Sequence, residues 1–102
     1  PNFIGDKKIL GEILELNVNN NEDLQNKIIL IENADPGFDW IFGHSINALI
    51  TKFGGTNSHM AIRCAEFNIP AAIGCGEQIY FALKNSKKIS LDCSAKVIKV
   101  IC

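Results

Sequence analysis

The run Ile28-Ile29-Leu30-Ile31, bounded by Lys27 and Glu32, restricts most strongly what this chain can fold into. A short β-branched run of this kind is typical of a strand that is covered on both faces. We therefore expect a central strand over 27–32, with further layers of structure on either side of it.

The rest of the chain alternates strand-like and helix-like patterns. A helix is predicted to begin at His59 with Ser58 as its N-cap, and Asn68 and Pro70 are expected to end it. Further strands are expected over 7–18, 48–53, 71–73, 88–92 and 96–101, a loop over 17–21, one helix opened by Asp35-Pro36 that carries Phe38, Ile41, Phe42 and Ile46, and another that carries Ile79, Tyr80 and Leu83. Strands at both ends and helices in the middle predict an α/β or α+β domain, with the helices packed on the sheet.

Size and charge exclude several classes of protein. A chain of 102 residues, 47% of them hydrophobic, is one folded domain, too short for two independent cores. Its net charge of -1 offers no general attraction for nucleic acid or for anionic membranes. No apolar run approaches the roughly 20 residues of a membrane span, and no secretory signal opens the chain. We expect a cytoplasmic protein and, because the chain starts at Pro1, a fragment of a longer polypeptide.

The four cysteines predict neither a disulfide framework nor a metal site. Cys64, Cys75, Cys93 and Cys102 lie in separate segments, with no Cys-x-x-Cys pair and no histidine at zinc-ligand spacing. We interpret them as free thiols in a reducing compartment.

The segment Gly54-Gly55-Thr56-Asn57-Ser58-His59 carries the chemistry that the sequence suggests. Unpaired N–H groups and the positive end of the dipole at a helix N-terminus favour a negatively charged group such as a phosphoryl group. Glycines let the backbone approach such a group closely. A neutral imidazole there has a ring-nitrogen lone pair that can act as a nucleophile. Ser58 can cap the helix or donate a hydrogen bond to a phosphoryl oxygen, and both roles remain open.

Other interpretations of this segment fit less well. The glycine pair lacks the third glycine of a dinucleotide-binding turn, and no Gly-Lys-Ser/Thr follows for a P-loop. Ser58 does not sit in a Gly-x-Ser-x-Gly turn, which argues against a serine hydrolase. A lone histidine after a glycine turn is also common as a surface residue without catalytic role.

One family has a closely similar signature. The mobile domain of the phosphoenolpyruvate-utilising enzymes resembles the stretch Gly54-Gly55-x-x-Ser58-His59-x-Ala61-Ile62, continuing into Glu66-x-x-Ile69-Pro70-Ala71 and Gly74. Weaker similarity begins at Asp35-Pro36-Gly37-Phe38 and includes Thr51 and Asp92. The family includes phosphoenolpyruvate synthase, pyruvate phosphate dikinase and rifampin phosphotransferase.

The resemblance implies a swivelling β/β/α phosphohistidine domain of the α/β class over residues 1–102. His59 would be the phosphoryl carrier, assisted by Ser58, with Gly54, Gly55, Thr56 and Asn57 around the phosphoryl group. Phosphate would come from ATP or phosphoenolpyruvate and pass to a small-molecule acceptor. The resemblance also implies partner domains in a longer polypeptide: an ATP-grasp domain, which would hold ATP and Mg²⁺, and a substrate domain. It implies no metal or cofactor within this domain.

The chain departs from the family at Ala65, where an arginine is common. Arg63 is expected on a different helix face from position 65, because two residues rotate a side chain by roughly 200°. Its expected role is an ion pair with Glu66. The loss of a guanidinium at position 65 leaves open an alternative, a catalytically silent regulatory or binding module with the same fold. If Cys102 is the natural end, the architecture is closer to rifampin phosphotransferase; if it is not, a synthase or dikinase is equally open.

Overall fold

The fold was analysed in a computed structural model that describes residues 2–16, 23–33, 36–55 and 57–101. Its elements follow the chain as β1 (Asn2–Ile4), β2 (Lys8–Glu15), β3 (Ile28–Ile31), the 3₁₀ helix η1 (Pro36–His44), β4 (Ala48–Thr51), α1 (His59–Glu66), β5 (Ala71–Ile73), α2 (Glu77–Lys84), β6 (Lys88–Asp92) and β7 (Val97–Val100).

Seven strands form one curled sheet in the order β1-β5-β4-β3-β2-β6-β7. The central strands β2, β3, β4 and β5 are parallel to one another, whereas β1 pairs antiparallel with β5, β6 with β2, and β7 with β6. This mixed sheet with packed helices confirms the predicted α/β class.

The central strand is covered on both faces, as its sequence predicts. Ile28 and Leu30 belong to one buried cluster, and Ile29 and Ile31 belong to another on the opposite face. All four side chains are fully buried, and each buried side chain of this size contributes about 1.5–3 kcal/mol. The apolar sequence of β3 therefore requires a layer on either side.

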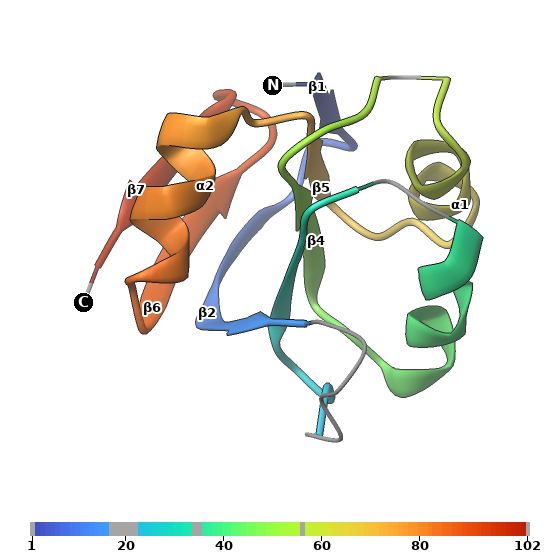
Figure 1. Ribbon diagram of the computed structural model, residues 1–102, viewed down its shortest axis with the longest axis horizontal. Helices are drawn as coiled ribbons and strands as arrows, with labels where there is room; N and C mark the ends of the chain where they lie inside the picture. Colours follow the sequence, from blue (N-terminus) through green and yellow to red (C-terminus); the bar gives the residue numbers. More distant parts are fainter. Residues whose placement is uncertain (1, 17–22, 34–35, 56, 102) are drawn as a thin grey trace.

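The two layers are different in kind. One cluster lies under η1 and α1 and includes Ile41, Met60 and Cys64. The other lies between the central strands and the β6–β7 and α2 side, and includes Leu83, Ile89 and Leu91. Figure 1 shows β6, β7 and α2 on one side of β4 and β5, and α1 on the other. The result is the β/β/α layering that the family resemblance implies.

Strand β2 joins these two layers. Its first part, Lys8–Glu12, pairs with β6, and its last residues, Ile13 to Glu15, pair with β3. The same continuous strand thus borders both halves of the sheet.

Most of the predicted elements are confirmed. The helix predicted after Pro36 forms as a 3₁₀ helix that ends at His44, so Ile46 lies beyond it. The strand predicted over 48–53 ends at Thr51, and β1 was not predicted. Asn68 has a φ of 58°, as expected for the residue that ends α1, and Pro70 follows it. Cys64, Cys75 and Cys93 are buried free thiols. The predicted loop over 17–21 lies outside the described residues. None of the helices in the described ranges has the length and apolar character needed to cross a membrane.

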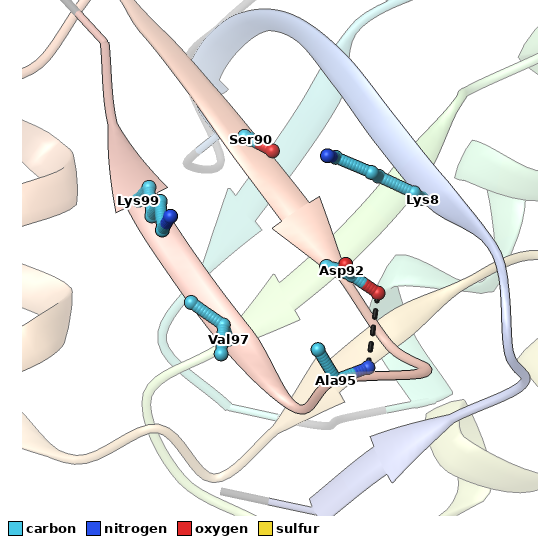
Figure 2. A pocket seen from close by; sticks show the side chains of 6 residues that line it. All are labelled: Lys8, Ser90, Asp92, Ala95, Val97 and Lys99. Carbon is cyan, nitrogen blue, oxygen red and sulfur yellow. Dashed lines mark hydrogen bonds between the residues drawn. The ribbon is translucent and has the colours of Figure 1, made fainter.

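The turn between β6 and β7 is closed by a side chain. The Asp92 carboxylate accepts a hydrogen bond of 3.0 Å from the backbone N–H of Ala95, which Figure 2 shows at the end of the hairpin. Lys8 of β2 and Lys99 of β7 flank the same shallow hollow. Asp92, one of the residues that are similar in the family, therefore stabilises the β6–β7 hairpin. This hairpin lies at one end of the strand order, and α1 contacts β1 and β5 at the other end.

Gly74, directly after β5, lies against the loop that leads to α1. Its φ is +73°, and a Cβ on Gly74 would collide with the backbone oxygen of Gly54. Only glycine therefore allows the two loops to touch here.

We expect Gly74→Ala to lower the free energy of unfolding by about 3 kcal/mol, because it adds a side chain at positive φ and a backbone clash. Urea denaturation of the variant measures this change. Gly43→Ala is the matched control, since a Cβ on Gly43 meets nothing within 4 Å and should leave stability nearly unchanged. Equal stability of the two variants would show that the close packing of Gly74 is unimportant.

Candidate phosphohistidine site

The site begins at the carboxyl end of β4, where Thr51 is fully buried. The Thr51 hydroxyl donates a hydrogen bond to the carbonyl of Phe53 at 2.8 Å and accepts one from the backbone N–H of Gly74 at 2.9 Å. One side chain thus connects the loop after β4 to the loop after β5.

Backbone hydrogen bonds hold the loop after β4 from both sides. Lys52 N–H donates to Ile31 O at 3.0 Å on the β3 side, and Cys75 N–H donates to Thr51 O at 2.8 Å on the β5 side. These bonds continue the sheet beyond the ends of its strands. The chain that reaches Gly54 is therefore rigidly supported.

Gly54 and Gly55 turn the chain from the sheet toward α1. Gly54 has a φ of 122°, in the region that favours glycine. A Cβ on Gly55 would meet nothing within 4 Å, so the space beside this glycine is open. Both glycines and Asn57 are exposed, which leaves the turn accessible to an incoming group.

Ser58 is the N-cap of α1, as predicted. Its backbone is extended, with φ of -69° and ψ of 155°, and its Oγ accepts a long hydrogen bond of 3.4 Å from the N–H of Ala61. The hydroxyl hydrogen is not used in this contact, because Oγ acts there as the acceptor. Ser58 can therefore cap the helix and still donate to an oxygen outside it.

His59 is the first residue of α1 and projects to the surface. The helix is anchored below it by the buried residues Met60, Ala61 and Cys64. The His59 side chain is 40% exposed, and its Nε2 lies 3.0 Å from Oδ1 of Asp39 on η1. The backbone that carries this imidazole is therefore firmly held, while part of the ring is open to solvent.

Asp39 has a second partner, which is a cation. Arg63 Nε lies 3.2 Å from the same Oδ1 atom. The hydrogen bond from His59 is the largest influence on the pKa of Asp39, which is lowered; partial burial opposes this shift, and Arg63 adds to it. Asp39 is therefore ionised near neutral pH and acts as an acceptor, so its bond to His59 requires a hydrogen on Nε2.

The structure brings together most of the residues that the sequence singled out. Gly54 and Gly55 follow β4, Asn57 and Ser58 lie directly before α1, and His59 is its first residue. Thr56 lies outside the described residues, so its predicted place beside the phosphoryl group stays a prediction.

Sequence reasoning missed Asp39. It lies 20 residues before His59, on another element, and no local pattern links the two. The expectation for Arg63 was incomplete: its pair with Glu66 exists at 4.0 Å, but Arg63 also contacts Asp39. The spacing of four residues from His59 was the available signal, because it places both side chains on one helix face.

The second histidine has a different setting. His44 is exposed at the end of η1 and makes an edge contact with Trp40, with ring centroids 5.5 Å apart. Within the described ranges, no group of three or more His, Cys, Asp or Glu side chains could hold a metal ion.

Thr51→Val should lower the free energy of unfolding by about 2 kcal/mol, because it removes two hydrogen bonds and leaves the half-buried Gly74 N–H without its acceptor. Chemical denaturation provides the measurement. Thr51→Ser, which keeps the hydroxyl, should lose clearly less. A valine variant as stable as the serine variant would contradict the role given to the hydroxyl.

The Asp39 contacts predict a pH dependence. Because the pKa of Asp39 is lowered in the folded protein, its contacts stabilise the fold above the ordinary Asp pKa and are lost as the pH falls through the lowered value. Asp39→Asn should therefore weaken the loss of stability between about pH 5 and pH 2. Unfolding free energies across this range test it, with Asp6→Asn as an exposed control. An acid profile identical to that of the unmodified protein would count against the ionised contact.

The chain is similar to proteins of one known family. A family model described as "PEP-utilising enzyme, mobile domain" matches residues 24–96. The chain is 30% identical over 67 residues to phosphoenolpyruvate synthase of Neisseria meningitidis serogroup B, covering 66% of this chain and 8% of that protein. It is 28% identical over 90 residues to phosphoenolpyruvate synthase of Escherichia coli K12, covering 88% and 11%. The chain thus spans about a tenth of the length of these relatives.

A solved structure shares the fold. The solution NMR structure of a UPF0107 protein superposes with a TM-score of 0.71 over 98% of this chain and 96% of that one, at 15% identity. This likeness concerns the fold alone. The family match covers the glycine turn, His59 and all of α1, and the chain belongs to the family of the PEP-utilising enzyme mobile domain.

Proposed function

We propose that this chain is the phosphoryl-carrier domain of a multidomain phosphotransferase, in which His59 is transiently phosphorylated. The observation that carries the proposal is the placement of His59: an exposed imidazole on the first residue of α1, directly after an open glycine turn. The family membership and the relatives named phosphoenolpyruvate synthase support it.

The surroundings of His59 fit an anionic phosphoryl group. Backbone N–H groups of the first turn of a helix have no partners within the helix and carry positive partial charge. The open space at Gly55 offers room, and the Ser58 hydroxyl has a hydrogen to donate. Gly54, Gly55, Thr56 and Asn57 are the residues that we propose surround the phosphoryl group.

A rigidly held histidine suits a carrier that must react at both a donor site and an acceptor site. In-line phosphoryl transfer depends mainly on positioning and on electrostatic stabilisation. The buried face of α1 and the hydroxyl of Thr51 hold the turn before His59 in one geometry. The same geometry can then be presented first to a donor and afterwards to an acceptor.

The donor would be ATP or phosphoenolpyruvate, and the acceptor a small molecule. We propose that an ATP-grasp domain, holding ATP and Mg²⁺, and a substrate domain belong to the same polypeptide. The short match, about a tenth of each relative, supports a multidomain setting. The buried free thiols fit the reducing environment of the cytoplasm.

The alternative was a silent regulatory module, suggested by the missing guanidinium at Ala65. Arg63 weakens that argument, since it supplies a guanidinium that shares Asp39 with His59. The carrier is therefore the function that the geometry supports best.

The direct test uses the full-length protein that contains this chain, incubated with Mg²⁺ and ATP, or with phosphoenolpyruvate, and without acceptor. Mass spectrometry should find acid-labile, base-stable phosphate on the His59 peptide. His59→Ala should lose this label, because it removes the nucleophile, and His44→Ala should keep it. Undiminished labelling of the His59→Ala protein would overturn the assignment of the carrier to His59, and no label with either donor would favour the silent module.

A further inference from the structure

Arg63 is the single arginine of the sequence, and it lies one helical turn after His59. Residues four apart share a helix face, so both side chains point the same way. Their nitrogen atoms converge on one oxygen: Oδ1 of Asp39 lies 3.0 Å from His59 Nε2 and 3.2 Å from Arg63 Nε. An anionic oxygen is thus held between two nitrogens that belong to α1.

The guanidinium of Arg63 has supports of its own on α1. Its Cζ lies 4.8 Å from the centroid of the Phe67 ring, and Nη1 lies 4.0 Å from a carboxylate oxygen of Glu66. Stacking on an aromatic face restricts the plane of a guanidinium. Arg63 therefore has contacts that would remain if Asp39 moved away.

Asp39, in contrast, reaches the pair from a different element. It belongs to η1, and its side chain is 38% exposed. A phosphoryl group on Nε2 would occupy the space next to that nitrogen and carry negative charge. Like charges at this distance repel, so a phosphoryl group and the Asp39 carboxylate are competitors for one position.

We propose, on the basis of the carrier role given to His59 above, that the phosphoryl group on Nε2 replaces the Asp39 carboxylate as the partner of Arg63. Arg63 is then the phosphoryl-binding arginine of this chain, in place of the one missing at Ala65. Asp39 is the counter-ion of the resting state. A guanidinium has several N–H groups in a fixed fork and suits phosphoryl oxygens better than a lysine does.

Arg63 exchanges Asp39 for the phosphoryl group during the phosphoryl transfer to His59. Before transfer the imidazole moves its hydrogen from Nε2 to Nδ1 through water, which breaks the contact with Asp39. The Nε2 lone pair then forms the N–P bond while the P–O bond to the leaving oxygen breaks, and that oxygen keeps the electron pair. Arg63 Nε–H, released by Asp39, donates to a phosphoryl oxygen.

The test phosphorylates the protein with phosphoramidate, a small donor that needs no partner domain. The chain of 102 residues serves as the sample. Its fold aligns with 96% of the UPF0107 chain, which was studied in solution. A His44→Ala background leaves His59 as the one imidazole, because the sequence has two histidines. The single arginine gives one Nε–H signal in an NMR spectrum, which should shift when His59 is phosphorylated.

Variants measure the contact. Arg63→Gln should shorten the lifetime of the phosphohistidine about fivefold, since a hydrogen bond from a charged donor is lost. The loss of the positive charge also eases protonation of the ring, which promotes hydrolysis. Arg63→Lys should give a lifetime between those of the unmodified and the Arg63→Gln proteins, and Lys99→Gln, which removes a surface charge on β7, should leave the lifetime unchanged.

The outcomes separate the two proposals. A phosphorylated His59 with an unmoved Arg63 signal and an unchanged lifetime in Arg63→Gln would overturn the role of Arg63. It would leave the carrier role standing, since that role is judged by labelling from ATP or phosphoenolpyruvate. Failure of phosphoramidate to label His59 would count against both.

Discussion

The site depends on one buried hydroxyl group. Thr51 connects the loop after β4 with the loop after β5, through a bond to Phe53 O and another from Gly74 N–H. This bridge adds to the backbone bond from Cys75 N–H to Thr51 O, and both lie beside the close contact of Gly74 with Gly54. The conformation of the turn, and with it the start of α1, thus derives from the end of a parallel strand, where ligand sites of α/β sheets are commonly found.

Charged and polar side chains at the surface add contacts to those made by the backbone of the site. His59 and Arg63 come from one helix, and Asp39 from η1, so the charge balance of the site joins two elements of the outer layer. Each contact is partly exposed, and such contacts contribute little to stability. In the proposed transfer, His59 Nε2 carries a hydrogen while it contacts Asp39 and becomes free to react only when that contact is broken.

The sequence was sufficient for the parts of the fold that depend on local patterns. The apolar run 28–31 predicted a two-sided strand, and Ser58 and Asn68 marked the ends of a helix, because each of these signals acts within a few residues. It was insufficient for β1, a three-residue strand whose pairing with β5 spans about 70 residues. It was insufficient for Asp39 for the same reason: contacts across the fold leave no periodic trace in the chain.

The sharing of β2 between the two halves of the sheet has a mechanical consequence. Because Lys8–Glu12 pairs with β6 while the following residues pair with β3, the two halves of the sheet are joined by one unbroken strand. A tilt of one half relative to the other would have to bend β2 itself. A group attached to His59 would therefore move together with the whole domain. The direction in which it points would depend on the orientation of the domain.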